Sequence, residues 1–120
     1  MHHIGVDIIE ISRIRQAAAL WGDRFLSRLY TEAELETYLR RPHSLAARFA
    51  GKEAVIKALD KAAGISFKQI EILSAPDGKP VVRLHGRAQE QARSLGLSRL
   101  AISLSHSRDY AVALVMGDTE

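Results

Sequence analysis

The sequence predicts a single α+β domain in which an antiparallel sheet, drawn from three regions of the chain, packs on helices. A strand-like segment opens the chain at residues 3–10, and helical patterns fill most of residues 12–59. Strand patterns separated by short turns return from residue 67 onwards. A length of 120 residues is typical of one domain, so we expect a single hydrophobic core.

The opening strand carries a carboxylate among apolar side chains. One face holds Ile4, Val6 and Ile8, and the other holds Gly5, Asp7 and Ile9. An ionised carboxylate in the middle of a strand is costly unless it is paired or bound to a metal. Asp7 is therefore either half of a buried salt bridge, with Lys57 as the candidate partner, or a metal ligand.

Capping and turn residues divide the helical region into four segments. Gly22 separates the first two, and Thr31 forms a capping box with Glu34 at the start of the third. Pro42 is expected to end the third helix, and Ser44 can cap the fourth. We expect helices at residues 12–21, 23–30, 32–40 and 45–59.

The first two helices are rich in arginine and poor in acids, with Arg13, Arg15, Arg24 and Arg28 close to Phe25. Most charge clusters are solvated faces, and Phe25 would then pack inwards. The alternative is a docking patch, in which Phe25 is an apolar anchor and the arginines receive an acidic helix. The residues alone leave both interpretations open.

The fourth helix places two charges inside an apolar face. At 3.6 residues per turn, that face consists of Leu45, Ala46, Phe49, Ala50, Ala54 and Ile56. Glu53 and Lys57 project into it, above alanines that leave space for an anionic or metal-bound ligand. The alternative is an i,i+4 ion pair that stabilises the helix by about 0.2–0.5 kcal/mol.

The second half of the chain is mostly strands. We expect strands at residues 67–73 and 81–85 around a proline- and glycine-containing turn, then a helix at residues 87–95. A final hairpin should pair residues 101–105 with 110–116. The last strand is almost wholly apolar, so we expect it to be buried on both faces. His106 precedes the hairpin turn and is either a ligand contact or an exposed turn residue.

Composition and missing motifs exclude several classes of function. The net charge of +3 is below that of most dedicated nucleic-acid-binding proteins, and no apolar run is long enough to span a bilayer. The lack of cysteine and of a signal segment suits the cytoplasm. P-loop, dinucleotide-binding and zinc motifs do not occur. Asp7 and Glu53 are carboxylates of the kind that hold Mg²⁺, and Lys57 could neutralise a phosphate.

Five ordered blocks resemble the holo-acyl-carrier-protein synthases, the short bacterial class of 4'-phosphopantetheinyl transferases. The blocks span essentially the whole chain and lie at residues 5–14 (GVDIIEISRI), 24–35, 48–58 (RFAGKEAVIKA), 77–80 (DGKP) and 104–113. Each block alone is modest, but the ordered set is specific.

The resemblance implies the fold of this family and its reaction. The family transfers the 4'-phosphopantetheine group of coenzyme A to a serine of apo acyl carrier protein and releases adenosine 3',5'-bisphosphate. By resemblance, Asp7 and Glu53 would hold Mg²⁺, and Glu53 and Lys57 would be catalytic. Contacts to coenzyme A are implied for Arg48, Phe49, Lys57, Gly78, Lys79, Pro80 and His106. Contacts to acyl carrier protein are implied for Arg13, Arg24, Phe25 and Arg28.

The family's short members are trimers with sites between subunits, so a homotrimer is also implied. One departure stands out: many members continue the central helix into Gly-Thr-Gly, whereas this chain has Asp-Lys-Ala-Ala-Gly at residues 60–64. From the residues alone, two rival functions stay open. One is a small basic nucleic-acid-binding module, and the other is a non-catalytic trimer in which Asp7, Glu53 and Lys57 form an ion network.

Overall fold

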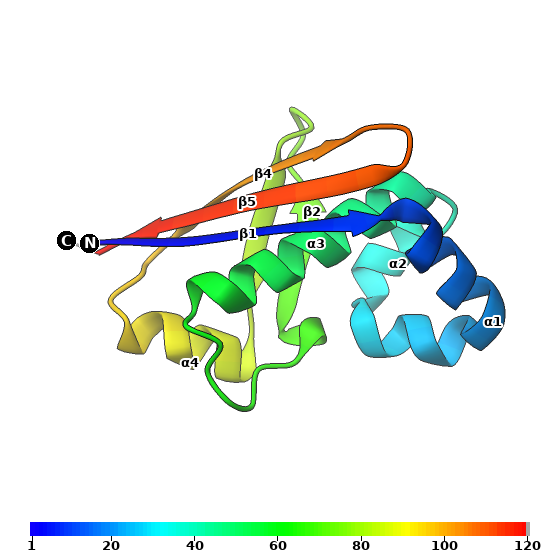
Figure 1. Ribbon diagram of the computed structural model, residues 1–120. Helices are drawn as coiled ribbons and strands as arrows, with labels where there is room; N and C mark the ends of the chain where they lie inside the picture. The colour runs from blue at the N-terminus through cyan, green and yellow to red at the C-terminus, as the bar shows by residue number, and fades with distance from the viewer. Residues whose placement is uncertain (120) are drawn as a thin grey trace.

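Two antiparallel sheets and four helices make up the computed structural model, which describes residues 1–119. The larger sheet contains β1 (His2–Glu10), β5 (Tyr110–Asp118) and β4 (Leu100–His106), in that order. A separate hairpin contains β2 (Ile70–Ser74) and β3 (Pro80–Leu84). The α+β prediction is confirmed, although the hairpin forms a sheet of its own. The first and last strands are neighbours, so both ends of the chain lie at the same end of the sheet (Figure 1).

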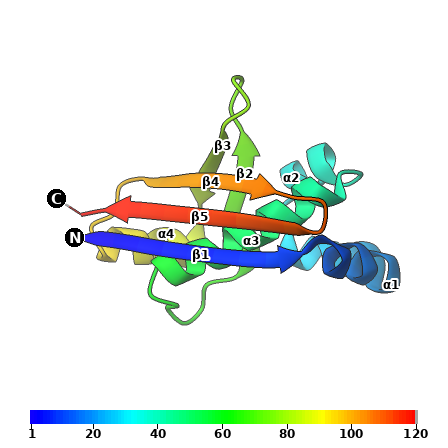
Figure 2. The ribbon, with the colours of Figure 1, turned by 45° about the horizontal axis from the view of Figure 1, so that its top comes forward.

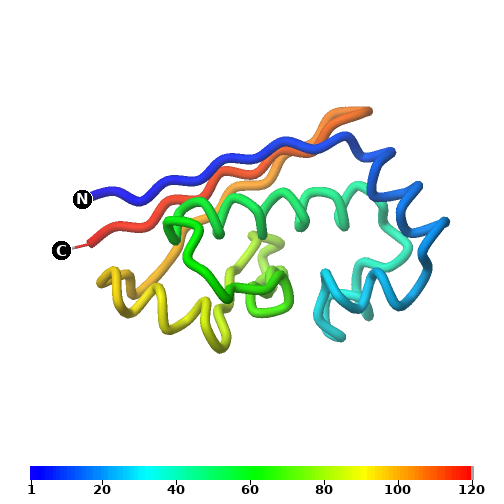
Figure 3. The backbone as a smooth tube through the Cα atoms, turned by 60° about the horizontal axis from the view of Figure 1, so that its bottom comes forward, coloured from blue at the N-terminus to red at the C-terminus, as the bar shows by residue number. Residues whose placement is uncertain are grey.

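The helices are α1 (Ile11–Leu29), α2 (Glu32–Tyr38), α3 (Pro42–Ala58) and α4 (Gly86–Ser94). Helix α3 runs along the inner face of the larger sheet, while α1 and α2 lie at one end of it and α4 at the other (Figure 3). No helix within residues 1–119 combines the length and apolarity needed to cross a membrane.

Helix α3 is buried on most of its sides. Its buried residues are Leu45, Ala46, Ala47, Arg48, Ala50, Gly51, Lys52, Ala54, Val55 and Ala58. The prediction of one broad apolar face was therefore wrong, because the helix contacts both sheets. Its closest approach is to β1 at Gly5, where an added Cβ would lie 1.8 Å from the carbonyl oxygen of Ala54. Glycine at this position lets β1 and α3 approach backbone to backbone.

Three predicted boundaries differ from those observed. Pro42 starts α3 instead of ending the previous helix, since proline is well suited to the first turn, where its missing N–H has no partner to lose. Residues Phe67–Gln69 form a 3-10 turn, so the strand begins only at Ile70. Gly22 bends α1 with φ 70° and ψ −155°, and the helix continues beyond the bend.

The outer face of the larger sheet is apolar and exposed. Val6 of β1 pairs with Leu114 of β5, and Ile4 pairs with Met116. These side chains, with Ile8, are 45–63% exposed. The prediction that β5 is buried on both faces was therefore wrong for a single chain, because α3 covers only the inner face.

Candidate active site

The closest approach of β1 and α3 brings Asp7 and Glu53 to the same cavity. This cavity has a volume of about 390 Å³. Helix α1 forms another part of the wall, where the lining residues are Arg13, Ile14, Ala17 and Phe25. Phe49 lines it from α3. The structure therefore unites the two predicted metal ligands with two of the four predicted carrier-protein contacts.

The electrostatic environment of Glu53 reflects two carboxylates near each other. Partial burial raises the pKa of Glu53, and the negative charge of Asp7 raises it further, while Lys57 and Lys61 act in the opposite direction. Lys61 follows α3 and was not singled out from the sequence. Ionising both acids is costly without a cation between or beside them.

The donor set fits Mg²⁺. Within residues 1–119, no group of three or more histidine and acidic side chains gathers to hold a metal ion. Mg²⁺ does not need such a group, since it is usually held by one or two carboxylates and keeps several waters or phosphate oxygens. Asp7 and Glu53 supply two carboxylates, and the cavity leaves room for those further ligands.

Lys57 is tied to β1 beside this cavity. Its Nζ donates hydrogen bonds to the carbonyl oxygen of Val6, at 2.8 Å, and to Oδ1 of Asp7, at 3.2 Å. The predicted Asp7–Lys57 salt bridge therefore exists, but it is not buried, because the two side chains are 21% and 38% exposed. Lys57 does not itself line the cavity, but its ammonium group contacts Asp7, which does.

Apart from Phe49, the other predicted coenzyme A contacts do not line this cavity. Gly78, Lys79 and Pro80 lie at and just after the tip of the β2–β3 hairpin, which projects away from the larger sheet (Figure 2). His106 ends β4, and its ring packs against that of His43 in a tilted arrangement with 5.1 Å between centroids. Within one chain, none of these four residues therefore lines the cavity that Asp7 and Glu53 share.

Arg48 is buried against the hairpin. Its Nε donates to the carbonyl oxygen of Ile72, and one terminal nitrogen donates to Oγ of Ser74. The guanidinium carbon lies 3.6 Å from the ring centroid of Tyr38. Two of its five N–H donors are thus occupied within the chain, which leaves three for a contact with coenzyme A.

Comparison with known proteins identifies the family. Residues 3–115 match the family model of the 4'-phosphopantetheinyl transferase superfamily. The chain belongs to this superfamily. The holo-[acyl-carrier-protein] synthase of Dehalococcoides mccartyi is 53% identical over 116 residues, which cover 97% of this chain and 98% of that protein. The synthase of Herpetosiphon aurantiacus is 46% identical over 94% of this chain and 95% of its own length.

Solved structures of such synthases share the fold of this transferase. The Helicobacter pylori synthase in complex with coenzyme A has a TM-score of 0.86 at 32% identity, covering 96% of this chain and 99% of that one. The Neisseria meningitidis synthase has a TM-score of 0.84 at 33% identity, covering 98% of each chain. The chain is therefore an enzyme of the phosphopantetheinyl transferase class.

The basic helix of the transferase carries an apolar pair that the sequence interpretation missed. Arg24 and Arg28 are exposed on the part of α1 beyond the bend, and Phe25 is half-buried at the cavity. Just before the bend, Leu20 and Trp21 are 73% and 65% exposed. The sequence signal for this surface was a pair of large apolar residues directly before a glycine, because a helix bend at the glycine can leave both side chains exposed to solvent.

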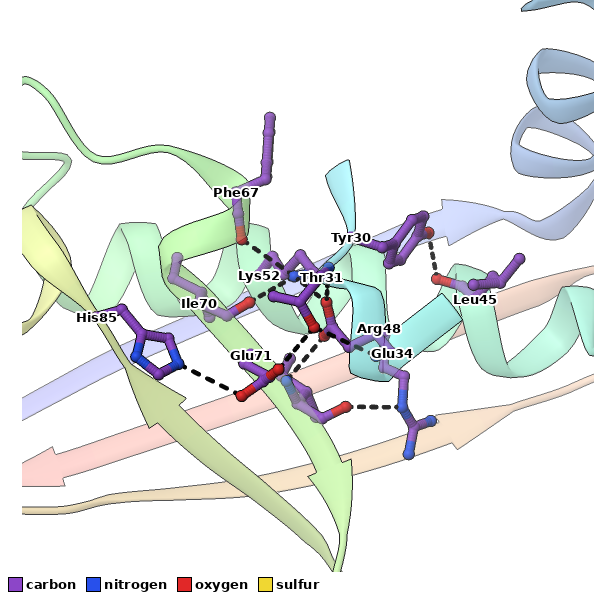
Figure 4. A network of polar contacts seen from close by, with 11 residues as sticks. Tyr30, Thr31, Glu34, Leu45, Arg48, Lys52, Phe67, Ile70, Glu71 and His85 are labelled. Atoms are coloured by element: carbon purple, nitrogen blue, oxygen red, sulfur yellow. Dashed lines mark hydrogen bonds and ion pairs between the residues drawn. The ribbon is translucent and has the colours of Figure 1, made fainter. Parts of the chain in front are cut away.

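A buried polar network behind the cavity was also missed. Lys52 of α3 and Glu34 of α2 form an ion pair at 2.7 Å, and neither side chain is exposed (Figure 4). The predicted capping box is confirmed: Thr31 and Glu34 cap α2 reciprocally. No local pattern indicated that Glu34 has a second role, because a capping glutamate is normally solvated.

Proposed function

We propose that this transferase moves the 4'-phosphopantetheine group from coenzyme A to a serine of apo acyl carrier protein, with Mg²⁺ bound by Asp7 and Glu53. The products are holo acyl carrier protein and adenosine 3',5'-bisphosphate. The reaction would serve fatty-acid or related lipid synthesis in the cytoplasm. The single observation that carries the proposal is the cavity shared by Asp7, Glu53 and the basic helix α1.

The residues of the cavity suit each part of this reaction. The serine oxygen forms a bond to the phosphorus that carries pantetheine, and the bond from this phosphorus to the diphosphate bridging oxygen breaks. Glu53 accepts the serine proton, since its carboxylate lines the cavity that the serine must enter. Lys57 neutralises charge on the diphosphate from its fixed position beside Asp7. Mg²⁺, when bound, supplies further charge neutralisation.

The basic surface of α1 suits an acidic carrier protein. Arg13 lies both on this surface and at the cavity wall, so a protein that contacts the arginines can present its serine to Glu53. Arg24 and Arg28 extend the surface away from the cavity. This arrangement supports the docking alternative for Phe25 over simple inward packing, although the side chain is half-buried.

We further propose a homotrimer with sites between subunits. The exposed apolar face of the larger sheet supports an assembly, because monomers rarely leave such a contiguous face open. The separation of Gly78, Lys79, Pro80 and His106 from the Asp7–Glu53 cavity also supports it. These residues and Arg48 could then contact coenzyme A held at the cavity of a neighbouring subunit, whereas Phe49 lines the cavity of its own chain.

The test is a mass measurement on the carrier protein. The purified chain is mixed with coenzyme A, Mg²⁺ and apo acyl carrier protein, and the carrier should gain the mass of phosphopantetheine. Glu53→Gln should abolish the gain while the assembled state, measured by light scattering, is unchanged. Glu90→Gln, on the exposed side of α4, is the matched control and should transfer normally. Undiminished transfer by Glu53→Gln would reject the role of this carboxylate.

A further inference from the structure

The Glu34–Lys52 pair is the most completely buried charged contact of residues 1–119. Lys52 Nζ donates to Oε1 of Glu34 at 2.7 Å, to the carbonyl oxygen of Phe67 at 3.0 Å, and to that of Ile70. Figure 4 shows the ammonium enclosed by these three acceptors. Burial lowers the pKa of Lys52, and Glu34 opposes this effect.

The carboxylate of Glu34 is equally well bonded. Its Oε1 accepts the backbone N–H of Thr31 and its Oε2 accepts that of Ile72, both at 2.8 Å. The pair therefore joins α2, α3 and β2 at one point. Tyr30, which ends α1, adds a hydrogen bond from its hydroxyl to the carbonyl oxygen of Leu45 in α3, at 2.6 Å.

Helix α3 needs such a restraint because its buried surface is smooth. Six of its buried residues are alanine or glycine, namely Ala46, Ala47, Ala50, Gly51, Ala54 and Ala58. Helices keep their rotation and register largely through side-chain ridges that fit into grooves, and small side chains make shallow ridges. Directional hydrogen bonds at Lys52 can replace the missing restraint.

Lys52 directly precedes the proposed metal ligand. Consecutive helical residues point about 100° apart around the axis, so the direction of Lys52 determines that of Glu53. With Lys52 bonded to β2 and Phe67, Glu53 faces the cavity that it shares with Asp7. A rotation of α3 would carry Glu53 away from that cavity.

We propose that the Glu34–Lys52 pair is a positioning device that fixes the rotation of α3 and so holds Glu53 opposite Asp7. Neither residue lines the cavity. A role beyond stability is reasonable, since buried ion pairs are often no more stabilising than apolar residues of the same size. The inference rests on the proposed metal site at Asp7 and Glu53.

The experiment measures metal binding directly. Mn²⁺, a spectroscopically visible ion with similar oxygen ligands, is titrated into the chain in the presence of coenzyme A and followed by electron paramagnetic resonance. Glu34→Gln should weaken Mn²⁺ binding about tenfold or more, as changes behind a metal site commonly do. It should also lower kcat while leaving the KM for coenzyme A nearly unchanged. Leu97→Ala, a buried truncation in the segment after α4, is the stability control and should bind Mn²⁺ like the wild type.

Each outcome decides between positioning and a merely structural role. Wild-type Mn²⁺ affinity in folded Glu34→Gln, or an equal loss in Leu97→Ala, overturns the proposal. If Glu34→Gln does not fold, the double variant Glu34→Gln/Lys52→Met, which leaves no unpaired buried charge, takes its place with the same expectation. Failure of both to fold assigns the pair to folding and also overturns the proposal. Equal Mn²⁺ binding by the wild type and Glu53→Gln instead refutes the metal site itself, and the positioning role with it.

Discussion

Gly5→Ala tests the close approach of β1 and α3 on which the site depends. The new Cβ would lie 1.8 Å from the carbonyl oxygen of Ala54 and 3.1 Å from the backbone nitrogen of Ala58, whereas real Cβ contacts hardly ever fall below 3.0 Å. Strand and helix would have to separate by roughly 1 Å, and gaps of 0.5–1 Å already forfeit about a quarter to a half of the dispersion energy of a contact. Because both obstacles are backbone atoms, no side-chain rotation can relieve the clash. We expect a loss of at least about 3 kcal/mol in the free energy of unfolding.

Gly117→Ala is the matched control for this substitution. Gly117 is also a buried strand glycine, but its added Cβ would meet the ends of two leucine side chains, Leu100 at 2.7 Å and Leu97 at 3.0 Å. These ends can move, so the loss should be about 1–2 kcal/mol. Urea denaturation of both variants at one fixed protein concentration checks the difference, because assembly would make apparent stability concentration-dependent. A smaller loss for Gly5→Ala than for Gly117→Ala would refute the reasoning.

Three further predictions address the turn after α3, acid stability and docking. Lys61 is in the left-handed region with φ 52°, so Lys61→Gly should raise the free energy of unfolding by up to about 1 kcal/mol relative to Lys61→Ala, as measured in urea. The hydroxyl of Thr31 is the main cause of the lowered pKa of Glu71, and a lowered carboxyl pKa contributes stability that is lost as pH falls below about 4.5. Thr31→Val should therefore destabilise the chain more at pH 7 than at pH 3. An equal loss at both pH values would mean that Thr31 stabilises the chain only as the cap of α2. Trp21→Ala should raise the KM for acyl carrier protein about fivefold or more without changing that for coenzyme A, whereas Leu39→Ala, on exposed surface after α2, should change neither.

Local sequence signals predicted most of the secondary structure. The capping box at Thr31 and Glu34, the hairpin turn at residues 75–80 and the alternation of β1 all depend on neighbours within a few residues. Such patterns can be interpreted from the sequence alone, because the interactions that cause them lie within the same short segment. The exceptions also have local causes: Pro42 can either end one helix or start the next, and only the packing of α3 on the sheet decides between them.

The pairing of Glu34 with Lys52 could not be predicted in the same way. Each residue has an ordinary local explanation, as a capping residue and as a helical lysine. Their contact depends on how α2, α3 and β2 meet, and it spans 18 positions of the chain. By contrast, Asp7 could be singled out because a carboxylate in the middle of a strand has no ordinary local explanation. Unusual residues are therefore visible in the sequence, whereas ordinary residues with unusual partners are not.

The turn after α3 contains residues that rarely adopt its backbone conformation. Asp60 and Lys61 both adopt positive φ, at 60° and 52°. Aspartate tolerates that conformation, but lysine does so at a cost, since its Cβ crowds the carbonyl oxygen that follows. The positive charge of Lys61 lowers the pKa of Glu53 and so opposes the effects of burial and of Asp7. If the charge of Lys61 serves the site, Lys61→Gly should make the chain more stable but raise the pKa of Glu53, the proposed proton acceptor. The pH dependence of kcat should then shift to higher pH in Lys61→Gly, and an unchanged profile would show that the cationic side chain does not act on Glu53.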